Sequence, residues 1–227
     1  GPVWSQPLQH GADMVIYSAT KYIGGHSDVI AGTCLGSKEV IGRMKVLRTF
    51  LGNMPSPWTS WLLMRSLETL KVRMEAQAQN AKKVAKYLKS HPLVEKIYYL
   101  GNICPEKEPE NYAIFKKQYS STGAMISFDI KGGEKEAFAF LNNLKLIKLA
   151  VSLGSTESLA EHPYTMTHAD ISEEEKNDIS ITEKLIRISV GIENHQDLIN
   201  DMEQAFDKIN DTPSSDKPFK ISPIMMN

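Results

Sequence analysis

The residue best suited to covalent chemistry is Lys21, which follows a short apolar segment and precedes two glycines. Residues 13–17 are apolar and partly β-branched, which predicts a buried strand, and the glycine pair predicts a break in regular structure. A lysine fixed at the end of a strand, with open backbone beside it, can attack an aldehyde and form a Schiff base. The hydroxyls of Ser18 and Thr20 could bind a phosphate beside it. Spacing alone does not assign this role, because a loop lysine is more often a solvated charge.

A second candidate is Arg187, which lies inside an alternating apolar strand predicted over residues 185–192. A charge in such a strand needs a partner or access to water. The pattern fits an edge arginine facing solvent and a planar clamp for a substrate carboxylate equally well. The sequence pattern by itself leaves both open.

Three segments resemble motifs of one enzyme family. Residues 17–32 read YSATKYIGGHSDVIAG. They resemble the cofactor-lysine signature of the cysteine/methionine-metabolism family of pyridoxal-phosphate enzymes, which includes methionine γ-lyase, cystathionine lyases and synthases, and homoserine sulfhydrylases. Residues 149–168 and 185–193 resemble two further family motifs. The resemblance extends over nearly the whole chain.

This resemblance implies a site. Lys21 would hold pyridoxal 5'-phosphate as a Schiff base and act as the catalytic base, and Ser18 and Thr20 would hydrogen-bond the phosphate. Arg187 would bind the α-carboxylate of an amino-acid substrate. No metal is expected, because the histidines show no ligand spacing with either cysteine.

The same resemblance places Ser152, and with it Thr167, in the substrate pocket, and makes Val151 the residue most informative about the substrate. Family members that act on cystathionine often carry a glutamate at the position of Val151, whereas methionine γ-lyases resemble this chain in having valine. An apolar side chain leaves room for a thioether and cannot pair with a distal ammonium. Val151 could also be a core residue.

The implied reaction is carbon–sulfur bond cleavage. Methionine γ-elimination to methanethiol, 2-oxobutyrate and ammonia is favoured. Cystathionine γ-synthase, γ-lyase or β-lyase activity and homoserine-ester sulfhydrylase activity stay open, as does a catalytically silent fragment or interaction module. Family members place a long segment before the position of Gly1, so full activity is expected to need it.

The elements that position these residues predict two unequal α/β parts. Residues 1–75 are expected to form the C-terminal part of a cofactor-binding large domain, with strands at 13–17 and 29–35 and a helix capped by Ser37. A long helix over about residues 58–90 leads into a small C-terminal α/β sandwich domain, residues 76–210. Its predicted elements are strands 94–100, 124–130, 146–153 and 185–192 and helices 111–119, 134–144 and 196–209. Residues 211–227 are expected to be a disordered tail. The resemblance implies the aspartate-aminotransferase-like fold.

Composition limits the partners. The 26 basic residues are matched by 27 acidic ones, so the net charge of -1 does not favour nucleic acid. No apolar run approaches the ~20 residues that span a bilayer. The two cysteines, Cys34 and Cys104, could form a disulfide but are expected to be reduced, which favours the cytoplasm. The resemblance implies a homo-oligomer, with a tetramer built as a dimer of dimers, and Trp58 and Trp61 are expected in a core or a subunit interface.

Overall fold

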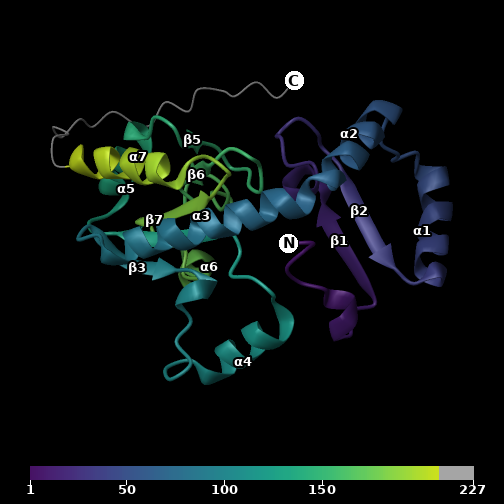
Figure 1. The fold of residues 1–227 in the computed structure, drawn as a ribbon, viewed down its shortest axis with the longest axis horizontal. Coiled ribbons are helices and arrows are strands. Elements are labelled where there is room, and N and C mark those ends of the chain that lie inside the picture. The colour runs from purple at the N-terminus through teal and green to yellow at the C-terminus, as the bar shows by residue number, and fades with distance from the viewer. Residues whose placement is uncertain (210–227) are drawn as a thin grey trace.

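The computed structural model describes residues 1–209 of the 227-residue chain. These residues form a two-stranded sheet flanked by helices at one end and a five-stranded sheet flanked by helices at the other, joined by a long helix (Figure 1). The tail predicted over residues 211–227 lies outside the described residues.

The two-stranded sheet carries the turn that contains Lys21. Strand β1 (Met14–Ser18) pairs antiparallel with β2 (Gly32–Gly36), preceded by the short helix η1 (Pro7–His10). Between the strands lies a single π-helical turn, η2 (Ala19–Ile23). Both strands were predicted from their apolar content, over residues 13–17 and 29–35, and the turn between them was not. The expected burial of the first strand is not seen within the described residues, where Met14 and Ile16 are 42% and 69% exposed.

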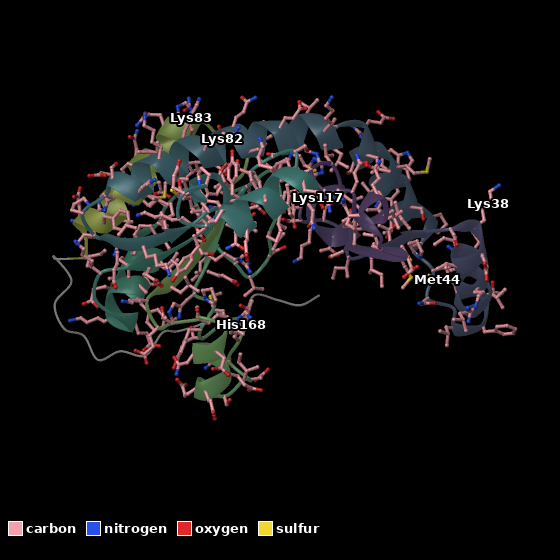
Figure 2. All side chains as sticks on the ribbon, turned by 90° about the horizontal axis from the view of Figure 1, so that it is seen from below. Lys38, Met44, Lys82, Lys83, Lys117 and His168 are labelled. Carbon is pink, nitrogen blue, oxygen red and sulfur yellow. The ribbon has the colours of Figure 1, made fainter. Side chains whose placement is uncertain are left out.

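Helix α1 (Lys38–Leu51) begins where the sequence predicts, because the Ser37 hydroxyl accepts a hydrogen bond from the Val40 amide at 3.2 Å. The helix lies at one end of the molecule, where Figure 2 labels Lys38 and Met44. None of its residues is buried, and Phe50 is 83% exposed.

The long helix predicted over residues 58–90 is in fact two helices, α2 (Pro57–Glu68) and α3 (Leu70–Ser90), so the prediction of one continuous helix is wrong. The break falls at Thr69, whose backbone angles are φ -105° and ψ 2°. The physical reason is Arg73, a buried side chain whose Nη2 donates to the Ser66 carbonyl at 2.9 Å and whose Nε donates to Thr69 Oγ1 at 3.1 Å. These bonds satisfy groups at the end of α2.

The second sheet has the strand order β3-β4-β7-β6-β5, antiparallel except for the parallel pair β5–β6. Its strands are β3 (Val94–Tyr98), β4 (Met125–Ile130), β5 (Lys148–Leu149), β6 (Leu159–Glu161) and β7 (Leu185–Ser189). The strand predicted over residues 146–153 is therefore only two residues long. Most of its predicted length is a loop held by side chains of β7, described below, and β6 was not predicted.

The sheet buries one face against α3, α5 (Glu134–Asn143) and α7 (His195–Asp207). Phe128, Phe140 and Phe206 meet in this core, with ring centroids 4.5 to 6.2 Å apart. Ile186 and Ile188 of β7 point into it, so Arg187 between them points to the opposite face. Three further helices are η3 (Leu100–Asn102), α4 (Pro109–Gln118) and α6 (Glu173–Asp178), of which α4 was predicted.

The mixed sheet with covering helices is the predicted α/β class. The domain boundary near residue 75 stays a prediction, since α3 contacts both the turn η2 and strands β3 and β4. Across residues 1–209, no helix combines the length and apolar character that crossing a bilayer requires.

Candidate active site

Lys21 lies in the middle of the turn η2, where its backbone angles of φ -84° and ψ -125° depart from helical values. The turn is closed by amide donation from Gly24 to the Ala19 carbonyl and from Gly25 to the Lys21 carbonyl, each at 2.7 Å. The Lys21 amine donates to Ser152 Oγ at 3.1 Å. The structure therefore brings together two predicted site residues that lie 131 positions apart.

Arg187 contacts the same serine from the other side. Its Nη2 donates to the carbonyls of Val151 and Ser152 at 3.0 and 3.1 Å. Its Nη1 pairs with Glu161 Oε1 at 2.6 Å, across the register in which Glu161 of β6 faces Arg187 of β7. Arg187 thus has the partner that a charge inside a strand requires, and the partner is a fully buried carboxylate.

Two atoms of this ion pair, Arg187 Nε and Glu161 Oε2, are buried without a hydrogen-bond partner in the part of the chain that the structure describes. Burial raises the pKa of Glu161, and the attraction of Arg187 opposes that rise. Burial likewise lowers the pKa of Arg187, opposed by Glu161, but a guanidinium stays charged in proteins. The unpaired Nε is a charged donor suited to an anionic ligand such as a carboxylate.

Tyr22 forms the contact between the Lys21 turn and the loop of Ser152. Gly154 has φ +79°, and a Cβ added there would lie 2.8 Å from the Tyr22 amide nitrogen. The Gly154 amide donates to Ser189 Oγ of β7 at 2.8 Å, which holds the loop in place. Burial raises the pKa of Tyr22 to about 12, against an opposing effect of Arg187, so its phenol is neutral at physiological pH.

The two predicted phosphate ligands differ in their contacts. Thr20 Oγ1 accepts a hydrogen bond from the Ala31 amide at 3.0 Å and donates to the Ala31 carbonyl at 3.3 Å, which ties the turn to the residue before β2. Ser18 is exposed, and its hydroxyl makes no capping bond to the turn. Ser18 is therefore free to donate to a phosphate, whereas Thr20 would have to give up the bond to Ala31. Both roles stay predictions.

The remaining predicted residues lie at the edge of the site. Val151 is 50% exposed, so it is not a core residue of the described part of the chain, and its carbonyl accepts a hydrogen bond from Arg187. Thr167 Oγ1 donates to Glu161 Oε1 at 3.3 Å. Thr167 therefore reaches Arg187 through the shared carboxylate. The substrate roles of both stay predictions.

Glu161 and Tyr22 are site residues to which the sequence reasoning gave no role. A signal for Glu161 exists, because a carboxylate in the apolar run Leu159-Ala160-Glu161 is a buried charge that needs a cation. Tyr22 gives no such signal beside Lys21. Within residues 1–209, no group of three or more histidine, cysteine, aspartate or glutamate side chains could hold a metal ion.

The chain is similar in sequence and in structure to proteins of one enzyme family. A family model described as "Cys/Met metabolism PLP-dependent enzyme" matches residues 1–207. The chain belongs to this family. The resemblance read from the three motifs is thereby confirmed.

Relatives of the family are similar over almost all of this chain. An L-methionine γ-lyase of Fusobacterium nucleatum subsp. polymorphum is 45% identical over 210 residues, covering 92% of this chain and 52% of the relative. A cystathionine γ-lyase of Bacillus subtilis (strain 168) is 47% identical over 209 residues, covering 92% of this chain and 54% of the relative. The chain thus spans about half the length of the curated relatives it matches.

The fold agrees with the family. The crystal structure of cystathionine γ-lyase from Lactobacillus plantarum, complexed with L-serine, is 42% identical and has a TM-score of 0.85, covering 92% of this chain and 54% of that one. The predicted fold class, part of a pyridoxal-phosphate enzyme fold, is confirmed.

The residues around Lys21 fit the cofactor that the family description names. Lys21 is a primary amine that is partly exposed and held by a single acceptor, Ser152. Ser18 offers a hydroxyl three residues away, and the Arg187 guanidinium contacts the Ser152 carbonyl. An aldehyde, a phosphate and a substrate carboxylate would each find a suitable group here.

Proposed function

We propose that this chain carries the cofactor lysine and the substrate anchor of a pyridoxal-phosphate-dependent carbon–sulfur lyase. The observation that supports it most is the position of Ser152, whose hydroxyl accepts from the Lys21 amine and whose carbonyl accepts from Arg187, both at 3.1 Å. An α-amino acid carries its amino and carboxylate groups on one carbon. A site for it therefore needs an amine-exchanging group and a carboxylate-binding group close together, as Lys21 and Arg187 are here.

The residues of this chain would divide the work as follows. Pyridoxal 5'-phosphate, when bound, supplies an electron sink for negative charge at the substrate α-carbon. Arg187 holds the substrate carboxylate through its guanidinium, which fixes the α-carbon relative to Lys21. The Lys21 amine accepts the α-proton and delivers it further along the substrate, and Ser152 Oγ orients that amine.

Methionine is the proposed substrate, cleaved by γ-elimination to methanethiol, 2-oxobutyrate and ammonia. The exposed apolar side chain of Val151, next to the carboxylate anchor, supports it, and so does the similarity to a protein named L-methionine γ-lyase. The second candidate is cystathionine, favoured by the 47% identity to a cystathionine γ-lyase. We further propose that full turnover requires residues corresponding to the half of the relatives that this chain does not match.

The proposed assembly is a homo-oligomer, a tetramer built as a dimer of dimers, that binds a small amino-acid substrate. The exposed apolar side chains on α1 and α2 support self-association: Phe50 is 83% exposed and Met64 70%. Trp58 and Trp61 are 67% and 47% exposed within the described residues, so they lie outside the core of the five-stranded sheet, and their place in a core or an interface stays a prediction. The proposed location is the cytoplasm, supported by the free thiols of Cys34 and Cys104.

The cofactor role of Lys21 is tested by chemical trapping. The chain is incubated with pyridoxal 5'-phosphate, reduced with borohydride and digested, and the label on each lysine is measured by mass spectrometry. We expect Lys21 to be labelled in preference to exposed lysines, the label to vanish in Lys21→Arg, and the exposed Lys45→Arg to be without effect. Labelling of Lys21 that does not exceed that of the exposed lysines would remove the proposal.

The substrate is tested separately, in a polypeptide of the relatives' full length that contains these 227 residues. Methionine, cystathionine and O-acetylhomoserine are assayed side by side in the wild type and in Val151→Glu. The introduced carboxylate is expected to shift the preference from methionine towards cystathionine, because it can pair with the distal ammonium. An unchanged preference would contradict the use of Val151, and no turnover of any of the three would favour a silent module.

A further inference from the structure

Three polar side chains near the start of α3 contact all three segments that build the site. They are Arg73, Gln77 and Asn80, spaced i, i+4 and i+7, which places them on one face of the helix. Arg73 and Gln77 are 5% and 0% exposed, and Asn80 is partly buried. Each donates to main-chain carbonyls, so these side chains fix the course of the backbone rather than that of other side chains.

Arg73 holds the turn that carries Lys21. Its Nη1 donates to the Tyr22 carbonyl at 2.9 Å and its Nη2 to the Ile23 carbonyl at 3.3 Å. Gly25 has φ +72°, and a Cβ at this position would overlap the Arg73 guanidinium. The Arg73 guanidinium therefore packs directly against the backbone of the residues that follow Lys21.

Gln77 holds the loop that carries Ser152. Its Nε2 donates to the carbonyls of Ser155 and Gly154 at 2.6 and 3.4 Å. Beside it, the Thr156 amide donates to the Gly25 carbonyl at 2.9 Å, which joins this loop to the Lys21 turn. Arg73 and Gln77 lie one helical turn apart on α3. The first is bonded to the turn that carries Lys21, and the second to the loop that carries Ser152.

Asn80 holds the segment that follows β7, the strand of Arg187. Its Nδ2 donates to the carbonyls of Gly191 and Glu193 at 3.1 and 2.7 Å. The Gly191 amide in turn donates to Ser158 Oγ at 2.8 Å. Ser158 lies two residues after Thr156, whose amide donates to the Gly25 carbonyl. The end of β7 is therefore fixed to the same helix face as the other two segments.

We propose that Arg73, Gln77 and Asn80, called the polar ladder below, are positioning residues that hold the Lys21 turn, the Ser152 loop and the end of the Arg187 strand in register. Neighbouring residues of α3, such as Met74, Ala81 and Val84, are buried in the core of the five-stranded sheet. The three polar side chains thus tie the site to the rigid part of the fold. The effect of these hydrogen bonds on catalysis rests on the proposed function, whereas their effect on the backbone segments does not.

The expected size of the effect follows from geometry. Reacting groups must be held to within about 0.5 Å of their productive positions, and a misplacement of about 1 Å can cost ~100-fold in rate. Loss of one ladder side chain leaves buried carbonyls without donors, so the segment concerned must shift or open to water. A purely structural residue would instead lower global stability without affecting these segments more than others.

The test compares variants of matched size. Arg73→Met and Gln77→Leu remove donors and keep volume, and Arg73→Lys is the conservative variant. Val84→Ala is the control for lost stability, because Val84 is a core residue of α3 without a hydrogen bond to the site. Lys82→Met is the surface control, at the outer edge formed by α3 (Figure 2).

Two readouts are needed. Amide hydrogen exchange of residues 19–25 and 152–156 measures how often these backbone segments open, and it needs no cofactor. The rate of borohydride-trapped labelling of Lys21 by pyridoxal 5'-phosphate reports its chemical consequence. We expect Arg73→Met and Gln77→Leu to speed exchange in these segments, and to slow labelling, by about tenfold or more. Arg73→Lys should recover part of both effects.

The outcomes separate the two proposals. Equal changes in the ladder variants and in Val84→Ala, at equal loss of global stability, would overturn the positioning role. Unchanged exchange in the ladder variants would overturn it as well. Faster exchange in the ladder variants together with a wild type whose Lys21 is not labelled would leave the positioning role standing and defeat the proposed function.

Discussion

Ser152 joins the two charged groups of the site through different atoms. Its hydroxyl contacts the Lys21 amine and its carbonyl contacts the Arg187 guanidinium. The anchor itself is set by Glu161, which is fully buried. Such a buried pair adds little net stability, because the cost of removing two charges from water offsets their attraction. Its value here is orientation, since it holds the guanidinium beside the carbonyls of Val151 and Ser152.

Breaking this pair should reveal the buried carboxylate. We expect Arg187→Met to lower the free energy of unfolding by about 3–5 kcal/mol, because it leaves Glu161 buried and unpaired. The double variant Arg187→Met/Glu161→Gln should recover part of that loss, since a neutral amide costs less to bury. Urea unfolding of the wild type, both single variants and the double variant measures this. Additive effects would contradict the coupling.

A buried histidine should make stability depend on pH. His162 is 1% exposed, with Nδ1 bonded to Thr165 Oγ1 and Nε2 to the Glu183 carbonyl, and burial lowers its pKa below the ordinary value of 6.5. Below that pH the unfolded chain binds the proton first. Stability should therefore fall as the pH falls below about 6.5, by at most ~1.4 kcal/mol per pH unit for one proton.

His162→Gln should flatten this slope, and the exposed His10→Gln should not. His91 acts in the same direction, because burial outweighs its acidic neighbours and lowers its pKa, so some slope remains. Glu161 acts in the opposite direction, since its raised pKa gives stability below about 4.5 that is lost as the pH rises above that value. Thermal unfolding between pH 5 and 8 measures the slopes, and identical slopes in both variants would contradict the assignment.

Sequence reasoning found the residues that carry unusual chemistry and missed those that hold them. The residue pattern made Lys21 and Arg187 candidates, and the resemblance of the surrounding motifs to one enzyme family gave them their expected roles. Arg73 and Gln77 bond to carbonyls 50 and 78 positions away. A backbone carbonyl is present at every residue, so nothing in the sequence marks which ones these side chains choose.

At the scale of elements, periodicity predicts most helices and strands but not their interruptions. The amphipathic pattern of α5 and the N-cap of α1 are local signals, and both elements appear where expected. The break at Thr69 is accompanied by the side-chain bonds of Arg73 to Ser66 and Thr69, and a hydrophobic period does not show where a polar side chain will bond to its own backbone. Strand β6 is three residues long and has no period to read.

Two glycines offer a matched test of the loop beside Lys21. Gly154→Ala should lower the free energy of unfolding by about 1–3 kcal/mol, since the residue has φ +79° and its Cβ would press on the Tyr22 amide. Gly42→Ala in α1 has open space around it and should raise stability by about 0.5–1 kcal/mol. Urea unfolding measures both. Equal effects would mean that the close approach to Tyr22 is not a constraint.

At the scale of the molecule, the two ends differ in how well they are covered. The five-stranded sheet buries its core, whereas α1 and α2 expose Phe50, Leu51, Trp58 and Met64, each more than half accessible. Large exposed apolar surfaces mark sites of association. The predicted oligomer is expected to form through this end.

The association is tested by charge. Phe50→Glu together with Met64→Glu should weaken self-association by tenfold or more, corresponding to at least ~1.4 kcal/mol. Ile179→Glu, at an apolar residue beyond α6 that is 55% exposed, is the control. Sedimentation velocity over a range of concentrations measures the mass. An unchanged distribution in the double variant would assign the oligomer to another surface.

The main chain and the side chain of Val151 have separate duties. The carbonyl accepts a hydrogen bond from Arg187, while half of the residue's surface faces solvent. Exchanging the side chain need not disturb that hydrogen bond, since every amino acid brings the same carbonyl. Under the proposed function, position 151 is therefore a natural target for a saturation library that alters selectivity and keeps the scaffold.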